Sequence, residues 1–349
     1  MAKYFTERER YKLETMLEDK IPVAQIAKRL GKCRQTIYNE IKRGKVEQMD
    51  TELVKHEVYK ADYAQRDFES KQSAKGPAYK IGSDWELYNF IQDKVLKEKW
   101  SPAAIAGYIK LHNLTFSCSL CFKTIYNYIH AGLFTDLSSD NLIRYKKKAK
   151  KGFKKVALKN MKGTSIEERP EQVKERSSFG HWEMDCVIGK QEKDSVLLVL
   201  TERQTRFEII RKIKDKTQKS VISALNSLEK KLGAPSFRDI FQSITMDNGS
   251  EFLNHDGIES SCLNSGRRTE TYYCHPFASW ERGSNECLNK MIRRWIPKGS
   301  PIGEYTKKYI KKISSWMNDF PRKIFGFCSS LEMLYESCPE YADILAGIN

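Results

Sequence analysis

HWEMDCVIGK at residues 181–190 and TMDNGSEF at residues 245–252 decide the fold of this chain. In each stretch an apolar, strand-like run carries an aspartate, Asp185 in the first and Asp247 in the second. Period-2 alternation places Glu183 and Asp185 on one face of the first strand, and Asn248-Gly249 directly after Asp247 is a turn signal. Both aspartates are therefore predicted at strand ends, where side chains from neighbouring strands meet at a cleft.

A third carboxylate follows further along the chain. ASWERGSNECLNKMIRRW at residues 278–295 predicts a largely basic helix that contains Glu281 and Glu286. Mg²⁺ prefers oxygen ligands and keeps several waters, so two or three carboxylates are enough to hold it. Three carboxylates delivered by two strands and a helix could hold a pair of Mg²⁺ ions, which suits phosphodiester chemistry on nucleic acid. A single aspartate before a turn is more often a cap or an Asx-turn, so the hypothesis depends on the whole set.

The composition favours a polyanionic partner. Lys and Arg number 61 against 45 Asp and Glu in 349 residues, which gives a net charge of +16. Such an excess favours nucleic acid through counterion release. No apolar run approaches the roughly 18 residues of a membrane helix, and the start, MAKYFTERERYKLE, is unlike a signal peptide. Nine scattered cysteines indicate reduced thiols, so we expect a cytoplasmic protein without a membrane partner.

Residues 1–57 are predicted to form a helix-turn-helix DNA-binding domain. Thr6 and Glu9 match a capping box at the start of a first helix. PVAQIAKRLGKCRQTIYNEIKRG at residues 22–44 then predicts two helices around a turn at Gly31. The shared core would consist of Ile26, Leu30, Ile37 and Ile41. The exposed side of the second helix would carry Arg34, Gln35, Tyr38 and Asn39. Arg, Gln and Asn are side chains that read base edges in the major groove. The alternative is an ordinary helical hairpin with a solvated polar face.

A second segment repeats this pattern. TIYNYI at residues 124–129 matches TIYNEI at residues 36–41, and we predict a second, diverged helix-turn-helix over residues 100–140 with Lys123 among its DNA contacts. Residues 58–99 are expected to be a polar helical linker. Residues 141–175 are expected to be a basic linker, because RYKKKAKKGFKKVALKNMKG has the lysine runs of a solvated tether. Such a tether could also track phosphates.

The pattern changes from about residue 178. Three strand-like segments, an amphipathic helix at residues 217–233, two further strands and then helices predict an α/β sheet with mixed strand directions. We place this catalytic domain at residues 176–335 and a C-terminal tail at residues 336–349. The whole chain is thus expected to be multidomain, with all-α helix-turn-helix units followed by an α/β domain.

These residues carry a resemblance to a known family. WEMDCVIGK resembles the first catalytic strand of retroviral integrases, and GHWEMD resembles the motif of bacterial insertion-sequence transposases. SWERGSNECLNKMIRRWIPKG, followed by NDFPRK at residues 318–323, closely resembles the IS-thirty family of DDE transposases. The resemblance covers most of the chain. It implies an RNase H-like, retroviral-integrase-like catalytic domain in a bacterial, nucleoid-associated protein.

The resemblance also assigns roles to the carboxylates. It implies that Asp185, Asp247 and Glu286 are the catalytic, metal-binding residues. Asp185 would bridge two Mg²⁺ or Mn²⁺ ions, and Asp247 and Glu286 would each hold one of them. DNA contacts on the helix after Glu286 would come from Lys290, Arg293 and Arg294. Glu286, Lys290 and Arg293 lie at i, i+4 and i+7, one helical face.

Glu281 remains an alternative third carboxylate. Gly283, Glu286 and Asn289 match the integrase-like pattern of a Gly three residues before the Glu and an Asn three residues after it. However, 38 residues separate Asp247 from Glu286, whereas 33 separate it from Glu281, and 33 is the number that the family usually shows. An insertion near HDGIESSCLNSG at residues 255–266 could account for the difference.

A zinc site is disfavoured. Cys118 and Cys121 are spaced like ligands with His112 and His130 nearby, but no second Cys pair follows. His181 and His275 could approach the catalytic metals, although a structural hydrogen-bonding role is expected for both.

The predicted function is that of a transposase. It would bind the terminal inverted repeats of a mobile element, cut DNA in a metal-dependent reaction and transfer the strand to target DNA, without a small-molecule substrate. We expect a homo-oligomer on double-stranded DNA, because two ends must be brought together. The alternatives are a catalytically inactive, sequence-specific DNA-binding regulator and a plain metal-dependent nuclease.

Overall fold

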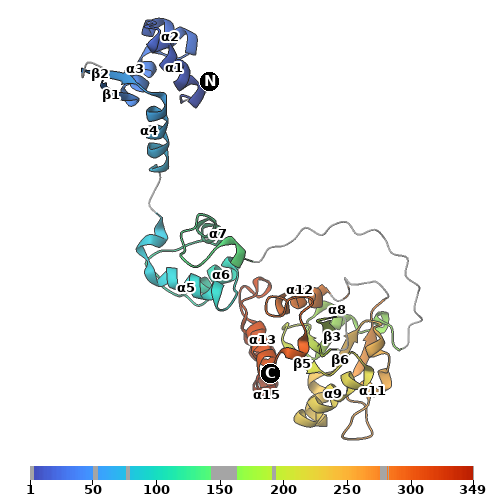
Figure 1. The fold of residues 1–349 in the computed structure, drawn as a ribbon. Coiled ribbons are helices and arrows are strands. Elements are labelled where there is room, and N and C mark those ends of the chain that lie inside the picture. Colours follow the sequence, from blue (N-terminus) through green and yellow to red (C-terminus); the bar gives the residue numbers. More distant parts are fainter. Residues whose placement is uncertain are drawn as a thin grey trace. The chain divides into compact units, whose positions relative to one another are not determined.

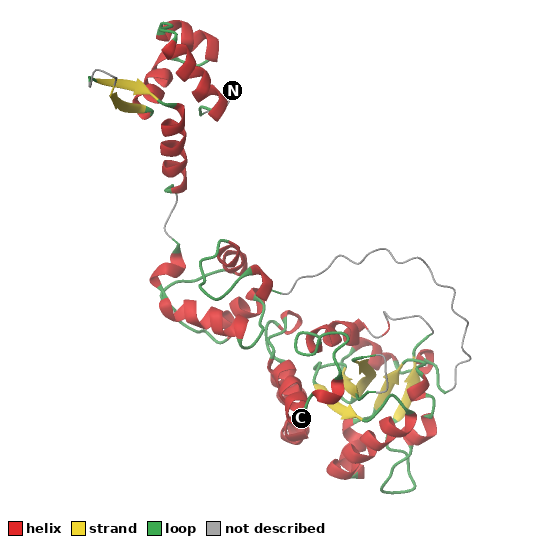
Figure 2. Cartoon of the chain, viewed as in Figure 1, coloured by secondary structure: helices red, strands yellow, loops and turns green. Residues whose placement is uncertain are grey.

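The computed structural model describes residues 4–49, 54–75, 79–142, 163–190, 194–275, 281 and 283–348. The chain divides into two compact units, residues 1–79 and residues 80–349 (Figures 1 and 2). No helix in the described ranges combines the length and apolar character needed to cross a membrane. All nine cysteines are free thiols, as the sequence indicated.

The first unit is built from four helices and one hairpin (Figure 1). Its elements are α1 (Glu7–Glu18), α2 (Val23–Leu30), α3 (Arg34–Arg43), β1 (Lys45–Met49), β2 (Lys55–Tyr59) and α4 (Ala61–Ser73). Thr6 caps α1 through the expected capping box with Glu9. Gly31 ends α2 in the left-handed conformation (φ 63°), which an L side chain rarely adopts, so the tight turn before α3 favours glycine.

The core of the first unit confirms the predicted packing of the two helices on either side of Gly31. Ile26 and Ile37 are completely buried, and Leu30 and Ile41 pack against them from partly exposed positions. The hairpin of β1 and β2 was missed by the sequence analysis, because its strands are almost wholly exposed and lack an apolar alternation. Alanines of α4 complete the core, so this helix belongs to the first unit.

The second unit begins with a helical part. Its elements are η1 (Lys80–Ser83), α5 (Trp85–Leu96), α6 (Pro102–Leu111), α7 (Phe122–His130) and η2 (Ser139–Asn141). Ile105 and Ile125 are completely buried together with Ile91 of α5. The expected linker at residues 58–99 is therefore divided differently: α4 packs in the first unit, and α5 supplies core residues to the second.

A five-stranded mixed sheet forms the centre of the second unit. Its strands are β3 (His181–Ile188), β4 (Val196–Glu202), β5 (Glu208–Ile213), β6 (Ser243–Met246) and β7 (Glu270–Tyr273). The spatial order is β5-β4-β3-β6-β7. β4 is antiparallel to β3 and β5, whereas β6 is parallel to both β3 and β7. Four strands therefore point the same way, and their C-terminal ends share one edge of the sheet.

Helices cover both faces of this sheet (Figure 2). The remaining elements are η3 (Ile166–Glu168), α8 (Glu171–Glu175), α9 (Gln218–Leu232), α10 (Ala234–Ile240), η4 (Ser250–Phe252), α11 (His255–Glu259), α12 (Gly283–Ile292), η6 (Ile302–Glu304), α13 (Lys307–Asp319), η7 (Lys323–Phe325), α14 (Ser330–Ser337) and α15 (Pro339–Ile348). One face packs against α12, α13 and the helical part of residues 80–142, and the other packs against α9, α10, α14 and α15.

Two expected boundaries are corrected by the structure. The supposed tail at residues 336–349 forms α15, whose Ala342 and Leu345 are completely buried against the sheet because the helix presents an apolar face. The supposed basic linker at residues 141–175 ends earlier than expected, since Ile166 and Val173 are buried and the Tyr273 N–H donates to the Thr164 carbonyl. Residues 143–162 of that linker lie outside the described residues.

Candidate active site

Asp185 lies inside β3, and Asp247 directly follows β6, the parallel neighbour of β3. β3 and β6 are parallel, and their register pairs His181 with Ser243 and Glu183 with Thr245. The same register continued by two residues places Asp185 beside Asp247, on strands that are about 4.8 Å apart. Both side chains are half-buried. The predicted strand-end position is correct for Asp247, which directly follows β6, but wrong for Asp185, because β3 continues to Ile188 and Asp185 pairs with Val199 of β4.

The two aspartates have different neighbours. Asn289 of α12 donates a hydrogen bond from Nδ2 to Asp185 Oδ2 at 2.7 Å. Arg293, the residue directly after α12, donates to the Ile188 carbonyl at 2.6 Å, so two contacts hold this helix and its end beside the C-terminal half of β3. Asp247 Oδ1 accepts from the Gly249 N–H at 2.9 Å, which is an Asx-turn. Asp247 therefore has the capping role that is common for an aspartate before a turn, at the end of β6.

Of the two candidates for the third carboxylate, the structure describes the side chain of Glu281 but not that of Glu286. Glu286 belongs to α12, but its side chain lies outside the described residues. The carboxylate of Glu281 is bound to His275 twice, by the backbone N–H at 2.9 Å and by Nδ1 at 2.7 Å. Glu281, followed by Glu167 on the other side of the ring, raises the pKa of His275. Glu281 is therefore held in a local ion pair.

His181 has the structural role that its sequence position suggested. Its Nδ1 is 2.8 Å from the Ser243 hydroxyl, across the β3–β6 pair. Burial, with smaller effects from the nearby Arg203 and Arg169, lowers the pKa of His181, which favours a neutral ring. The contact with Ser243 links β3 to β6, which is the structural hydrogen-bonding role expected for this histidine.

Glu251 is an acidic residue of the site that the sequence analysis missed. Its side chain is only 4% exposed, and Oε1 is 3.1 Å from Lys216 Nζ. Oε2 has no hydrogen-bond partner among the described residues. A Cβ atom added at Gly249 would lie 2.6 Å from Glu251 Oε2 and 2.8 Å from Asp247 Oδ1, so these two oxygens flank the same narrow space. The available sequence signal was its position four residues after Asp247 in TMDNGSEF.

Buried ion pairs support the strands behind the aspartates. Glu183, which shares a strand face with Asp185, is completely buried and ion-paired with Arg203. Arg169 donates to the Thr245 hydroxyl at 3.1 Å on the neighbouring strand. Because a buried carboxylate without a cation is strongly unfavourable, the Glu183–Arg203 pair fixes β3 against the end of β4, and the Arg169 contact separately anchors β6.

The described residues supply two adjacent candidate ligands for a metal ion. Within the described ranges, no group of three His, Cys, Asp or Glu side chains is placed to hold a metal ion. This applies to Cys118 and Cys121 as well: the Cys118 N–H donates to Asp84, and the Cys121 thiol is 3.2 Å from the Thr124 hydroxyl. Asp185 and Asp247 are the two candidate carboxylates among the described side chains, and the side chain of Glu286, the third expected ligand, lies outside the described residues.

The predicted DNA-reading residues of α3 are all accessible. Arg34, Gln35, Tyr38 and Asn39 are exposed, whereas Ile37 on the opposite side is buried. Gln35 Nε2 donates to Asn39 Oδ1 at 3.1 Å, so these two amides lie on the same helical face. The α3 helix therefore presents the polar face that base-edge contacts require.

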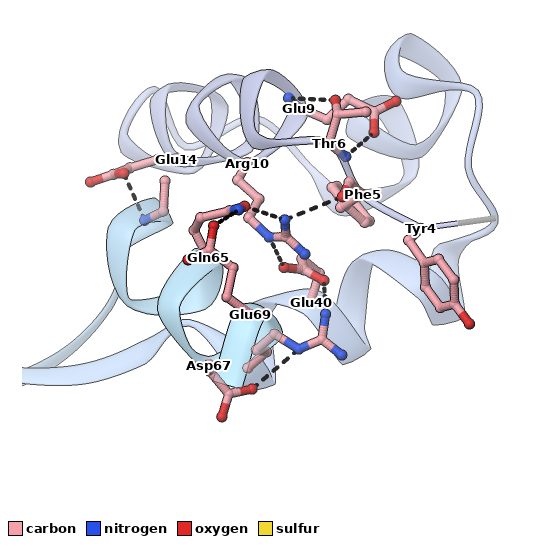
Figure 3. A network of polar contacts seen from close by, with 12 residues as sticks. Tyr4, Phe5, Thr6, Glu9, Arg10, Glu14, Glu40, Gln65, Asp67 and Glu69 are labelled. Atoms are coloured by element: carbon pink, nitrogen blue, oxygen red, sulfur yellow. Dashed lines mark hydrogen bonds and ion pairs between the residues drawn. The ribbon is translucent and has the colours of Figure 1, made fainter. Parts of the chain in front are cut away.

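A buried ion pair anchors α3 from behind (Figure 3). Arg10 of α1 is 1% exposed and contacts Glu40 Oε1 at 2.7 Å. The same guanidinium donates to Gln65 of α4 at 2.6 Å and to the Phe5 carbonyl at 3.2 Å. Arg43 joins the network by contacting Glu40 Oε2 at 2.8 Å. The network connects α1, α3 and α4, so it sets the orientation of the exposed face of α3.

Comparisons with known proteins agree with both parts of the chain. A family model described as a helix-turn-helix domain matches residues 2–44. The chain is 31% identical over 346 residues to a protein described as a probable transposase for the insertion-like sequence element IS1161 of Streptococcus salivarius, covering 95% of this chain and 94% of that protein. The chain belongs to the IS30, or IS-thirty, family of insertion-sequence transposases. This confirms the resemblance deduced from the motifs.

Other members of the IS30 family match over similar lengths. The transposase for insertion sequence element IS4351 of Bacteroides fragilis is 31% identical, over 95% of each chain. The transposase InsI for insertion sequence element IS30A of Escherichia coli (strain K12) is 28% identical, over 95% of this chain and 83% of its own. The likeness therefore includes the helix-turn-helix, the helical part and the sheet.

The remaining DNA-contact predictions fall in the second unit of this IS30-family chain. Lys123 is exposed at the start of α7, and Lys290 is exposed on α12. The guanidinium of Arg294 lies 5.1 Å from the Phe320 ring centroid and donates to the Lys99 carbonyl at 3.2 Å. Arg293 also has an internal partner, the Ile188 carbonyl. Both arginines thus have structural contacts, and their roles toward DNA stay predictions.

The expected second helix-turn-helix has local features of the first. Cys33 and Cys121 are the N-cap residues of α3 and α7, and each thiol contacts a threonine hydroxyl three residues later, at 3.0 Å and 3.2 Å. The connections differ, however, because residues 112–121 join α6 to α7 whereas residues 31–33 join α2 to α3. The similarity therefore lies in the second helix and its cap rather than in a tight turn.

Proposed function

We propose that this IS30-family protein is a DDE transposase that binds the terminal inverted repeats of its mobile element and catalyses metal-dependent cleavage and strand transfer. The observation that supports the proposal is the parallel register of β3 and β6, which, continued two residues beyond the Glu183–Thr245 pair, would bring Asp185 beside Asp247. A mixed five-stranded sheet with helices on both faces supports an RNase H-like catalytic domain, the fold that the sequence resemblance implied.

The proposed metal ligands are Asp185, Asp247 and Glu286. Asp185 and Asp247 satisfy the ligand chemistry of Mg²⁺ or Mn²⁺, since both are half-buried carboxylates at one edge. Asn289 contacts Asp185, and Glu286 precedes Asn289 by three residues on α12. Positions three apart lie on the same side of an α-helix. Because Glu286 is three residues before Asn289, we assign it as the third ligand. The bound ions would supply a nucleophile at neutral pH and stabilise the leaving oxygen of the phosphodiester.

The other residues of the site position these carboxylates. Asn289 holds one oxygen of Asp185, and the Gly249 N–H holds one oxygen of Asp247, so neither side chain rotates freely. Glu281 is kept on His275 in this arrangement, which favours Glu286 as the third ligand. Lys290 on the exposed side of α12 would contact phosphates near the scissile bond.

DNA recognition is assigned to the first unit. The exposed face of α3, with Arg34, Gln35 and Asn39, would enter the major groove of the terminal repeats. The α6–α7 part, with Lys123, would contribute a second DNA contact. Two element ends must be joined in one reaction, so we propose a homo-oligomer on double-stranded DNA in the bacterial cytoplasm.

The test uses the full chain and duplexes that carry the element's own ends. Incubation with Mg²⁺ or Mn²⁺, followed by mapping of cut and joined strands, should show both products. Asp185→Asn, Asp247→Asn and Glu286→Gln should each abolish cleavage and leave DNA binding intact, because an amide lacks the anionic oxygen that Mg²⁺ requires.

Glu281→Gln is the matched control on the same segment and should retain cleavage. Cleavage that survives in Glu286→Gln but is lost in Glu281→Gln would assign the third carboxylate to Glu281. Sequence-specific binding without cleavage in the wild-type chain would instead indicate an inactive regulator, and cleavage without strand joining would indicate a plain nuclease.

A further inference from the structure

A lysine-lined groove lies on the second unit, outside the residues assigned to catalysis. The groove measures about 710 Å³ and runs between the end of β5, one side of α9 and the first turns of α13. Five exposed lysines line it: Lys214, Lys219, Lys231, Lys307 and Lys311. Asp215 is the single acidic residue among the described residues of its lining. The groove is therefore strongly positive.

The sequence of α9 explains how the groove forms. Lys219, Ser223, Ser227 and Lys231 recur every four residues and share one side of the helix, while Val221, Leu225 and Leu228 are buried on the other side. Small serines between two lysines leave space for a bulky partner to approach the helix closely. Lys307 and Lys311 of α13 repeat the same spacing across the groove.

The charge of these lysines is not neutralised within the protein. None of the five lysines forms an ion pair within 4.0 Å of a described carboxylate, in contrast to Lys216, which contacts Glu251. Hydrogen bonds from Ser220 and Thr217, with Lys214 nearby, hold the pKa of Asp215 below its usual range, so this carboxylate stays charged and already bonded. The remaining positive charge is available to an external polyanion.

We propose that this groove binds the phosphate backbone of the target duplex, the DNA that receives the transferred strand. This inference rests on the proposed transposase function. Lysine and serine contact phosphates as point charges and hydrogen-bond donors, and such contacts carry no sequence information. The described lining contains no Asn or Gln, the amides that read adenine. DNA bound here is therefore held irrespective of its sequence, which suits a target duplex. The element ends, in contrast, require a sequence-specific recognition helix such as α3.

The position of the groove supports this assignment. Lys214 and Thr217 line the groove, and Lys216 between them contacts Glu251, whose Oε2 flanks the same space as Asp247 Oδ1. Duplex DNA in the groove would thus continue toward the carboxylate edge of the sheet. The stripe from Lys219 to Lys231 spans 12 residues of helix, about 18 Å. That length matches about five consecutive phosphates of one strand.

The test compares two triple variants of the full chain that remove the same charge. Lys231→Gln, Lys307→Gln and Lys311→Gln change the groove. Lys230→Gln, Lys308→Gln and Lys312→Gln change the adjacent exposed lysines on the same two helices, which do not line it. Binding to a random-sequence duplex is measured across salt concentrations, together with end cleavage and strand transfer into the same duplex. The melting temperatures of the two triple variants should be equal, because all six substituted side chains are exposed.

The groove triple should lower the slope of log affinity against log salt by about 2 to 3, because each lost phosphate contact removes about 0.9. Strand transfer should fall at least tenfold while end cleavage stays within twofold, and the neighbouring triple should match the wild type. Equal loss in both triples, or no loss in either, would overturn the groove as a DNA site. A reduced slope with unchanged strand transfer would overturn the target assignment. Absence of metal-dependent cleavage in the wild type would instead refute the proposed function, and the salt slopes would still test the groove.

Discussion

Asn289→Ala isolates the contact that positions Asp185. The Asn289 Nδ2–Asp185 Oδ2 hydrogen bond is 2.7 Å long and ends on a carboxylate, which makes it charge-assisted. Hydrogen bonds to charged groups contribute about 1.5–3 kcal/mol, and Asp185 is half-buried, so the lower end of that range applies. A loss of about 1.4 kcal/mol corresponds to a factor of ten in an equilibrium constant.

We therefore expect Asn289→Ala to weaken Mn²⁺ binding by about tenfold, within the 10- to 100-fold range typical of residues that orient metal ligands. Mn²⁺ titration of the full chain without DNA, followed by electron paramagnetic resonance, measures the affinity directly. Asn264→Ala is the matched control, because Asn264 Oδ1 accepts a 2.9 Å hydrogen bond from Gly266 in an exposed loop.

Melting in the presence of a chelator shows whether either variant disturbs the fold. Asp185→Asn defines the loss expected when the ligand itself is removed. An unchanged Mn²⁺ affinity in Asn289→Ala, alongside a large loss in Asp185→Asn, would refute the reasoning that α12 orients this aspartate.

Three further outcomes are expected. Arg34→Ala or Gln35→Ala should cost about 1–3 kcal/mol of binding to the element's ends and less on random duplex, measured by competition binding; equal losses would make them phosphate contacts. Burial raises the pKa of Glu208 to about 8 despite the opposing effect of a buried arginine. The protonated form therefore stabilises the fold at low pH, and that stabilisation is lost as pH rises through this value. The melting temperature should fall from about pH 6 to about pH 9 in the wild type and change less in Glu208→Gln. Lys216→Met should destabilise the second unit by about 1–2 kcal/mol, because it leaves the buried Glu251 without its cation, and adding Glu251→Gln should restore most of the loss in a chemical-denaturation experiment.

Local signals in the sequence were sufficient for the first unit. The capping box at Thr6, the left-handed glycine at Gly31 and the apolar spacing of Ile26 and Ile37 depend on neighbouring residues in the chain, and each is present in the structure. The exposed hairpin of β1 and β2 was not predicted, because its strands bury almost nothing and so lack the alternation that marks a half-buried strand.

The sheet was predictable in its strands but not in its full packing. Apolar runs at Asp185 and Asp247 indicated two strands. Their parallel pairing results from the two antiparallel steps β3–β4–β5 followed by the helical crossover through α9 and α10 to β6. The final segment was expected to be a tail, because α15 is short and its apolar positions have no local partner. Leu345 is buried in a cluster whose other members come from the sheet and from helices that include α9, α10 and α14.

The sequence by itself determined the family and the order of the parts and supplied the candidate carboxylates, because motifs and caps are properties of adjacent residues. Tertiary structure decided which groups meet around them. Glu251 joins Asp247, Asn289 contacts Asp185, and Glu281 is held by His275, and each contact depends on how separate segments fold together. The lysine groove has the same origin: Lys231 and Lys307 are far apart in the chain, and their charges combine only because α9 and α13 pack beside the end of β5.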